Sequence, residues 1–232
     1  MPSPERDTFA TPSADARLGA LLLGGGALGL IATCIGYVLA GPQAALPGGA
    51  TSAATAIAAT PLATGWMRMA GLFGMPSDVL LAAGALLLAA HEYRRRAVLA
   101  MAGWLTLAIA SALFIIVDAM VAMVLPVAAA QAGGEAAYAG LRALFEVLFA
   151  IGAWTAGVGA LAVAWRSEGT VFRWPAAGWG LRVAGLVGVL ASAAHLLGWP
   201  GAPMIGPGVA LLALATLGVA GACASRPDGQ VA

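Results

Sequence analysis

Three charged residues stand inside long apolar segments of the chain. Asp118 is the one charged residue of the run FIIVDAMVAM (114–123), and Arg142 and Glu146 lie four positions apart in the next apolar segment. Residues four apart on a helix share one face. An isolated charge in the hydrocarbon core costs about 2.5–3.5 kcal/mol on insertion scales, so charged residues there are paired or functional.

These residues are predicted to lie at a similar depth. Asp118 comes eight residues before the expected end of one span at Pro126. Glu146 comes eight residues after the expected start of the next span at Tyr138. Eight helical residues rise about 12 Å, so both acids lie well below the outer boundary. The sequence therefore predicts an intramembrane polar cluster of Asp118, Arg142 and Glu146, in which one of the two carboxyls holds its proton.

Two interpretations of this cluster stay open. It is either a structural clasp between two neighbouring helices or a proton- or ligand-responsive site that opens to the outer face. His195, Asp78 and Arg68 are candidates for further members on the outer side. Each has a structural explanation too. His195 can bond to a neighbouring helix, Asp78 can cap a helix that starts after Pro76, and Arg68 can snorkel to headgroups.

The sequence contains no motif for catalysis, metal binding or cofactor binding in the structural context that the motif requires. GGGALG (24–29) matches a dinucleotide-binding glycine pattern but lies in an apolar helix with no strand before it. Neither H-E-x-x-H nor G-x-S-x-G occurs. His91 and His195 are predicted at opposite depths, which disfavours a haem held by both, and two histidines are too few for a zinc or copper site. We expect no enzyme activity, no catalytic residue, no metal and no cofactor.

The composition defines the class of protein. Apolar residues make up 61% of the chain and charged residues 9%, against about 45–50% and about 25% in soluble domains. Such a chain needs the bilayer as part of its solvent. The net charge of +1 provides no basic face for nucleic acid. All eleven basic residues are arginine, and the lack of lysine excludes Schiff-base chemistry.

About 20 apolar residues cross the hydrocarbon core as a helix. On this criterion the sequence predicts an all-α polytopic transmembrane bundle over residues 17–225, with polar tails at 1–16 and 226–232. The segment 41–63 is expected to be a loop or a shallow re-entrant piece with room for a short helix. The predicted spans are about 18–40, 68–91, 97–125, 138–165, 181–198 and 204–222.

The distribution of arginine predicts the orientation. If the N-terminus is cytoplasmic, the outer side holds only Arg68 and Arg142. The cytoplasmic side then holds Arg6, Arg17, Arg94, Arg95, Arg96, Arg166, Arg173, Arg182 and Arg226. Such a bias is typical of the positive-inside rule. Both termini are therefore predicted to be cytoplasmic.

The layout of the chain also resembles known families. A first helix opens with RLGALLLGGG, a charge-poor loop follows, and WMRMAGLFGMPSDVLLAAGALLLAAH forms the second helix. This layout resembles small bacterial membrane families of about six helices that are described as domains of unknown function. The resemblance implies a multi-pass protein of the bacterial inner membrane and implies no chemistry.

Three classes of function remain open at this point. The first is a non-enzymatic accessory or sensor-like membrane subunit, with the lipid bilayer as its surroundings and with self-association or other subunits bound through small-residue faces. Such faces are expected at 24–29, 152–159 and 185–193. The second is a small proton-coupled transporter that uses the Asp118, Arg142 and Glu146 cluster. A membrane redox or haem-binding subunit is the third and is disfavoured by the histidine positions.

Overall fold

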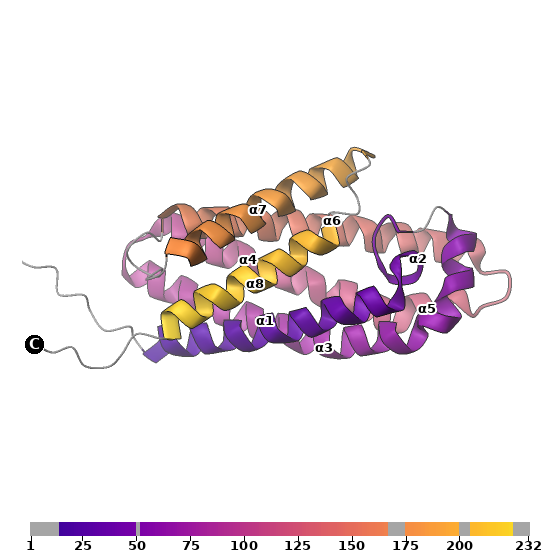
Figure 1. The fold of residues 1–232 in the computed structure, drawn as a ribbon, viewed down its shortest axis with the longest axis horizontal. Helices are drawn as coiled ribbons and strands as arrows, with labels where there is room; N and C mark the ends of the chain where they lie inside the picture. The colour runs from indigo at the N-terminus through magenta and orange to yellow at the C-terminus, as the bar shows by residue number, and fades with distance from the viewer. Residues whose placement is uncertain (1–13, 50–51, 167–174, 200–204, 225–232) are drawn as a thin grey trace, which may run out of the picture.

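The computed structural model describes residues 14–49, 52–166, 175–199 and 205–224, and every regular element in these ranges is helical (Figure 1). The all-α prediction is confirmed for this part of the chain. The long helices are α1 (Ala14–Ala40), α3 (Ala53–Arg94), α4 (Val98–Ala119), α6 (Glu135–Arg166), α7 (Pro175–Leu196) and α8 (Ile205–Ala224). The short elements are α2 (Pro42–Ala45), the π-helical turn η1 (Met120–Val124) and α5 (Leu125–Ala129).

The long helices form a closed ring. Each one packs against the next along the chain, from α1 to α3, α4, α6, α7 and α8, and α8 closes the ring against α1. In Figure 1, α1 begins and α8 finishes at the same end of the bundle, while α2 and α5 lie at the opposite end. We call these the terminal end and the α2 end.

Five helical segments of the described chain are long and apolar enough to cross a membrane. They are Ala14–Ala40, Ala53–Arg94, Val98–Ala129, Glu135–Trp165 and Ala176–Leu196. The apolar part of α8, Gly208–Gly221, would rise only about 21 Å, which is less than the roughly 30 Å hydrocarbon core. The chain is thus a multi-pass membrane protein, and the sixth span stays a prediction.

The second span differs most from its prediction. Residues 53–63, expected as part of a loop, form the first turns of α3. Between α1 and Gly49 the structure has only α2 and the turn that follows it. The oxygen Oγ of Ser52 accepts a hydrogen bond from the amide of Thr55 (3.2 Å) and caps α3. The helix then continues through both Pro61 and Pro76. Prolines are tolerated in membrane helices because other groups satisfy the freed backbone atoms.

Small residues bring the helices close together. Gly103 of α4 and Gly159 of α6 face each other, and a Cβ at either position would come within 2.9 Å of the other's carbonyl oxygen. Gly157 of α6 and Gly185 of α7 form a similar pair. The hydrophobic effect does not drive helix association in lipid, so close backbone contacts of this kind stabilise the packing. Gly26 and Gly29 of α1 lie equally close to Ser77 of α3, so all three small-residue faces predicted from the sequence pack within the chain.

The outside of the bundle is apolar as well. Leu21, Leu28 and Ile35 recur every seven residues along α1 and are 64%, 59% and 56% exposed, while Leu23 and Leu30 on the other side of the helix are buried. A helix that is hydrophobic all round faces lipid when it is not inside a large core. These surfaces are the contact with the bilayer.

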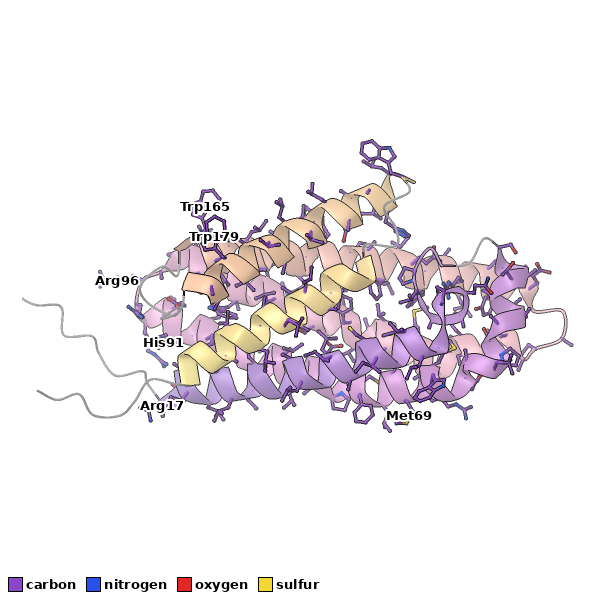
Figure 2. The ribbon with its side chains drawn as sticks, viewed as in Figure 1. Arg17, Met69, His91, Arg96, Trp165 and Trp179 are labelled. Atoms are coloured by element: carbon purple, nitrogen blue, oxygen red, sulfur yellow. The ribbon has the colours of Figure 1, made fainter. Side chains whose placement is uncertain are left out.

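The described arginines are concentrated at the terminal end. Arg17 and Arg96 lie there, together with the exposed Trp165 and Trp179 (Figure 2). Arg94 also forms an ion pair of 2.8 Å with Asp15 at the start of α1. The predicted N-terminal tail differs in one respect, because residues 14–16 belong to α1. Its first part, the C-terminal tail and Arg6, Arg173 and Arg226 lie outside the described residues.

Candidate functional site

Asp118 lies in the last turn of α4 and points into the ring. Its side chain is almost fully buried, and Oδ1 accepts a hydrogen bond of 2.5 Å from the hydroxyl of Tyr37 on α1. The π-helical turn η1 begins two residues later, at Met120. Such π-bulges inside α-helices are frequent at functional sites.

Asp78 of α3 is the second acid of this site. It is 1% exposed, and its carboxyl lies within hydrogen-bonding reach of the Asp118 carboxyl. Among the described residues, no donor reaches Oδ1 or Oδ2 of Asp78, or Oδ2 of Asp118. Two ionised carboxylates in contact repel each other strongly in an apolar interior. A proton between them would remove one negative charge and supply the missing hydrogen bond.

Glycines on α3 make this arrangement sterically possible. A Cβ at Gly74 would overlap the carboxylate of Asp118, so the acid fits only because position 74 has no side chain. One turn earlier, a Cβ at Gly71 would come within 2.7 Å of the backbone oxygen of Asp118. The close approach of α3 and α4 therefore places the two carboxyls together.

A cavity of about 310 Å³ adjoins the carboxyl pair. Its wall is mainly apolar and aromatic, and its polar groups come from the two acids and from the side chains of Tyr37, Thr33 and Cys34. A second cavity of about 40 Å³ shares Asp78, Leu30, Phe114 and Val209 with the first one. Asp78 thus lines both spaces. The larger cavity is lined by Leu30, Thr33, Cys34, Tyr37, Val38, Leu46, Asp78, Phe114, Asp118, Phe149, Val209 and Ala210.

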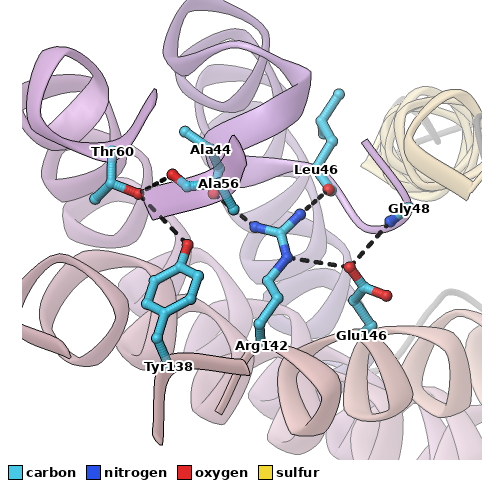
Figure 3. A network of polar contacts seen from close by, with 8 residues as sticks. All are labelled: Ala44, Leu46, Gly48, Ala56, Thr60, Tyr138, Arg142 and Glu146. Carbon is cyan, nitrogen blue, oxygen red and sulfur yellow. Dashed lines mark hydrogen bonds and ion pairs between the residues drawn. The ribbon is translucent and has the colours of Figure 1, made fainter. Parts of the chain in front are cut away.

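Arg142 and Glu146 form a separate polar cluster at the α2 end (Figure 3). The Nε of Arg142 donates to Oε1 of Glu146 at 3.0 Å. The guanidinium also donates to the carbonyl of Ala44 (2.7 Å) and to that of Leu46. The amide of Gly48 donates to the same Glu146 oxygen at 3.3 Å. Together the two side chains hold the segment of α2 and its following turn, residues 42–49, against α6.

A second contact near this cluster fixes α6 to α3. The hydroxyls of Tyr138 and Thr60 lie 3.4 Å apart, and Thr60 donates to the carbonyl of Ala56 (2.7 Å) (Figure 3). Tyr138 and Phe145 are both fully buried, and the Arg142 guanidinium lies 5.2 Å from the Phe145 ring centroid. The start of α6 is therefore held by both polar and aromatic contacts.

The three residues of the predicted cluster divide between two sites. The structure joins Arg142 to Glu146, as their spacing predicted. In the described part of the chain, Asp118 makes no hydrogen bond or ion pair with either of them. Leu46 connects the sites, because its carbonyl binds Arg142 and the residue also lines the cavity beside Asp118. A functional role for either site stays a prediction.

The three further candidates, His195, Asp78 and Arg68, do not lie together in the structure. Asp78 was interpreted as a helix cap, and that interpretation is wrong because α3 runs from Ala53 past Pro76. Arg68 is exposed on α3, and His195 is half-buried in the last turn of α7. No hydrogen bond or ion pair joins the side chains of Arg68 or His195 to Asp118 or Asp78 within the described ranges.

Tyr37 and Glu92 are buried side chains with polar groups that the sequence did not single out. Tyr37, the donor to Asp118, gave no signal beyond being a hydroxyl within an apolar span. Glu92 is 0% exposed near the end of α3, and within the described residues neither of its carboxylate oxygens has a donor. Glu92 stands within HEYRRR (91–96), so its polar neighbours gave no local signal that it is buried.

The comparisons with known proteins give no further information on the site. No protein-family model matches the chain, and neither a curated protein nor a solved structure matches it significantly. Fold and site together therefore define the class: a multi-pass helical membrane protein with a buried pair of carboxyl groups beside an apolar cavity.

Proposed function

We propose that this chain is a non-enzymatic, sensor-like or accessory protein of the bacterial inner membrane that responds to protons through Asp78 and Asp118. One observation carries the proposal: two carboxyls that are 1% and 3% exposed lie within hydrogen-bonding reach of each other. Buried intramembrane acids of this kind are typical of proton relays and ligand sites. Uptake or loss of the shared proton changes the charge between α3 and α4.

A change in the protonation of the pair can reach three helices. Asp118 also accepts the Tyr37 hydrogen bond, so the pair connects α1, α3 and α4. Two ionised carboxylates would repel α3 from α4 where Gly74 leaves room for the Asp118 carboxylate. A change of protonation would therefore alter the packing of three helices.

The second candidate function is a small proton-coupled transporter. The cavity beside the carboxyl pair favours it, because coupled transport needs a substrate site in contact with the proton site. In this form of the proposal Asp78 and Asp118 replace the Asp118, Arg142 and Glu146 cluster as the coupling residues. Arg142 and Glu146 then act as a clasp for residues 42–49.

Infrared difference spectroscopy tests the proton site. Purified protein in nanodiscs would be titrated and the C=O stretch of protonated carboxyl groups followed for wild type, Asp78→Asn, Asp118→Asn and Glu146→Gln. We expect a buried carboxyl band that is lost or shifted in both aspartate variants and kept in Glu146→Gln. A band that depends on Glu146 alone, or no buried carboxyl band at any pH, would overturn the proposal.

A further inference from the structure

The cavity beside the carboxyl pair has an unusual combination of walls. Its wall includes three aromatic residues, Tyr37, Phe114 and Phe149, and the aliphatic residues Leu30 and Leu46. Its volume of about 310 Å³ lies at the lower limit of small-molecule pockets, which span about 300–1,000 Å³. The space therefore suits a small ligand with an apolar body.

The polar part of the cavity offers acceptors without matching donors. In the described chain, three carboxylate oxygens lack a donor: both of Asp78 and Oδ2 of Asp118. The Thr33 hydroxyl, another polar group of the wall, already donates to the carbonyl of Gly29 (3.0 Å). Arg142 of α6 is held by Ala44, Leu46 and Glu146. Among the described residues, no arginine or histidine forms an ion pair with Asp78 or Asp118.

We infer that the cavity binds a small organic ammonium ion with an apolar or aromatic body, which takes the place of the proton shared by Asp78 and Asp118. A primary ammonium group carries three N–H donors, and three carboxylate oxygens of the pair lack one. Aromatic faces add a favourable interaction with the cation. The inference rests on the proposed proton site and names its ligand class.

The exchange balances in charge. One ammonium ion enters and one proton leaves, so the site keeps the same net charge in both states. An apolar ammonium ion also has a route from the bilayer, because Val38 is part of the cavity wall and is 68% exposed on the outer side of α1. The described chain thus connects the cavity with the surface that faces lipid.

Binding of 2-phenylethylammonium to the full-length protein in detergent tests the inference. Isothermal titration calorimetry measures saturable binding, and a pH indicator in weakly buffered solution measures proton release. The neutral control ligand is 2-phenylethanol, which has the same ring and chain but no charge. We expect close to one proton released per ammonium ion bound, and binding of 2-phenylethanol at least about tenfold weaker.

Two pairs of variants assign the binding to this cavity. Ala210→Phe on α8 fills the cavity and leaves both acids in place, whereas Leu214→Phe on the same helix changes a side chain that is 54% exposed to lipid. We expect binding to be lost in Ala210→Phe and kept in Leu214→Phe. Asp78→Asn and Asp118→Asn should each abolish the proton release. Size-exclusion profiles and thermal unfolding check that each variant is folded.

Three results would overturn the inference. They are no saturable binding to folded wild-type protein, equal affinity for 2-phenylethanol, and binding that survives in the Asp78→Asn/Asp118→Asn double variant. The proposed proton site is judged separately by its infrared band. A carboxyl band without ammonium binding would refute the ligand and keep the proton site, and the absence of the band would refute the proton site itself.

Discussion

Tyr37 and Asp118, 81 positions apart in the chain, are joined by a hydrogen bond of 2.5 Å in the interior of the bundle. The phenol donates to Oδ1, and the same carboxyl also interacts with the side chain of Asp78. One acid thus connects the first long helix with the second and third. This contact places a buried acid pair, and not an isolated charge, at the centre of the ring.

Tyr37→Phe should destabilise the protein, because it removes the donor and leaves Oδ1 of a buried carboxyl without a partner. We expect a loss of about 1–2 kcal/mol in the free energy of unfolding. Thermal unfolding in detergent would measure it. Tyr93→Phe is the control, since Tyr93 is 71% exposed. Equal effects of the two substitutions would contradict the contact.

Gly74→Ala should disturb the carboxyl pair through packing alone. The added Cβ would overlap the Asp118 carboxylate, and overpacking of this kind costs about 1–3 kcal/mol. We expect a lower midpoint of thermal unfolding and a shifted carboxyl band in the infrared spectrum. Gly65→Ala lies on the same helix with open space around it, so it should be neutral or slightly stabilising. A Gly74→Ala protein with unchanged stability and spectrum would refute this geometry.

Arg142→Met should release residues 42–49 from α6. The substitution leaves the carbonyls of Ala44 and Leu46 and the Glu146 carboxylate without their shared donor. We expect a loss of about 2 kcal/mol or more and faster hydrogen exchange in this segment.

Two controls separate this effect from the loss of a charge. Glu146→Gln should have a smaller effect, because the Glu146 side chain is 26% exposed and the amide oxygen of glutamine can still accept from Gly48. Arg68→Met changes an exposed arginine and should leave exchange at 42–49 unchanged. Uniformly faster exchange over the whole chain would show that Arg142→Met unfolds the bundle, against a local role.

The proposed orientation predicts which residues face the cytoplasm. Both native cysteines would first be removed by Cys34→Ser and Cys223→Ser. A single cysteine would then replace either Tyr93, near the terminal end, or Gln131, between α5 and α6. Both of these positions are exposed. A membrane-impermeant maleimide added to spheroplasts should label Gln131→Cys and spare Tyr93→Cys. The reverse pattern would show that the termini lie on the outer side.

The sequence already defined what kind of protein this is. An apolar content of 61% requires lipid as a solvent, and only helices or closed barrels satisfy their backbone there. The i and i+4 spacing of Arg142 and Glu146 predicted their ion pair, because both residues lie on one helix. Asp118 was recognised as a candidate from local sequence alone, since an acid within an apolar span always needs an explanation.

Only the tertiary structure decided which partner each acid has. The direction in which Asp118 points depends on the rotation of α4 and on η1, and depth along a helix does not specify that rotation. The motif PSDV (76–79) carries the signals of a helix start, but α3 continues through it, and the Ser77 hydroxyl donates to the carbonyl of Phe73 within the helix. Asp78 is thereby an interior partner of Asp118. Contacts between helices far apart in the chain, made possible by glycines such as Gly74, determine the site, and no local pattern encodes them.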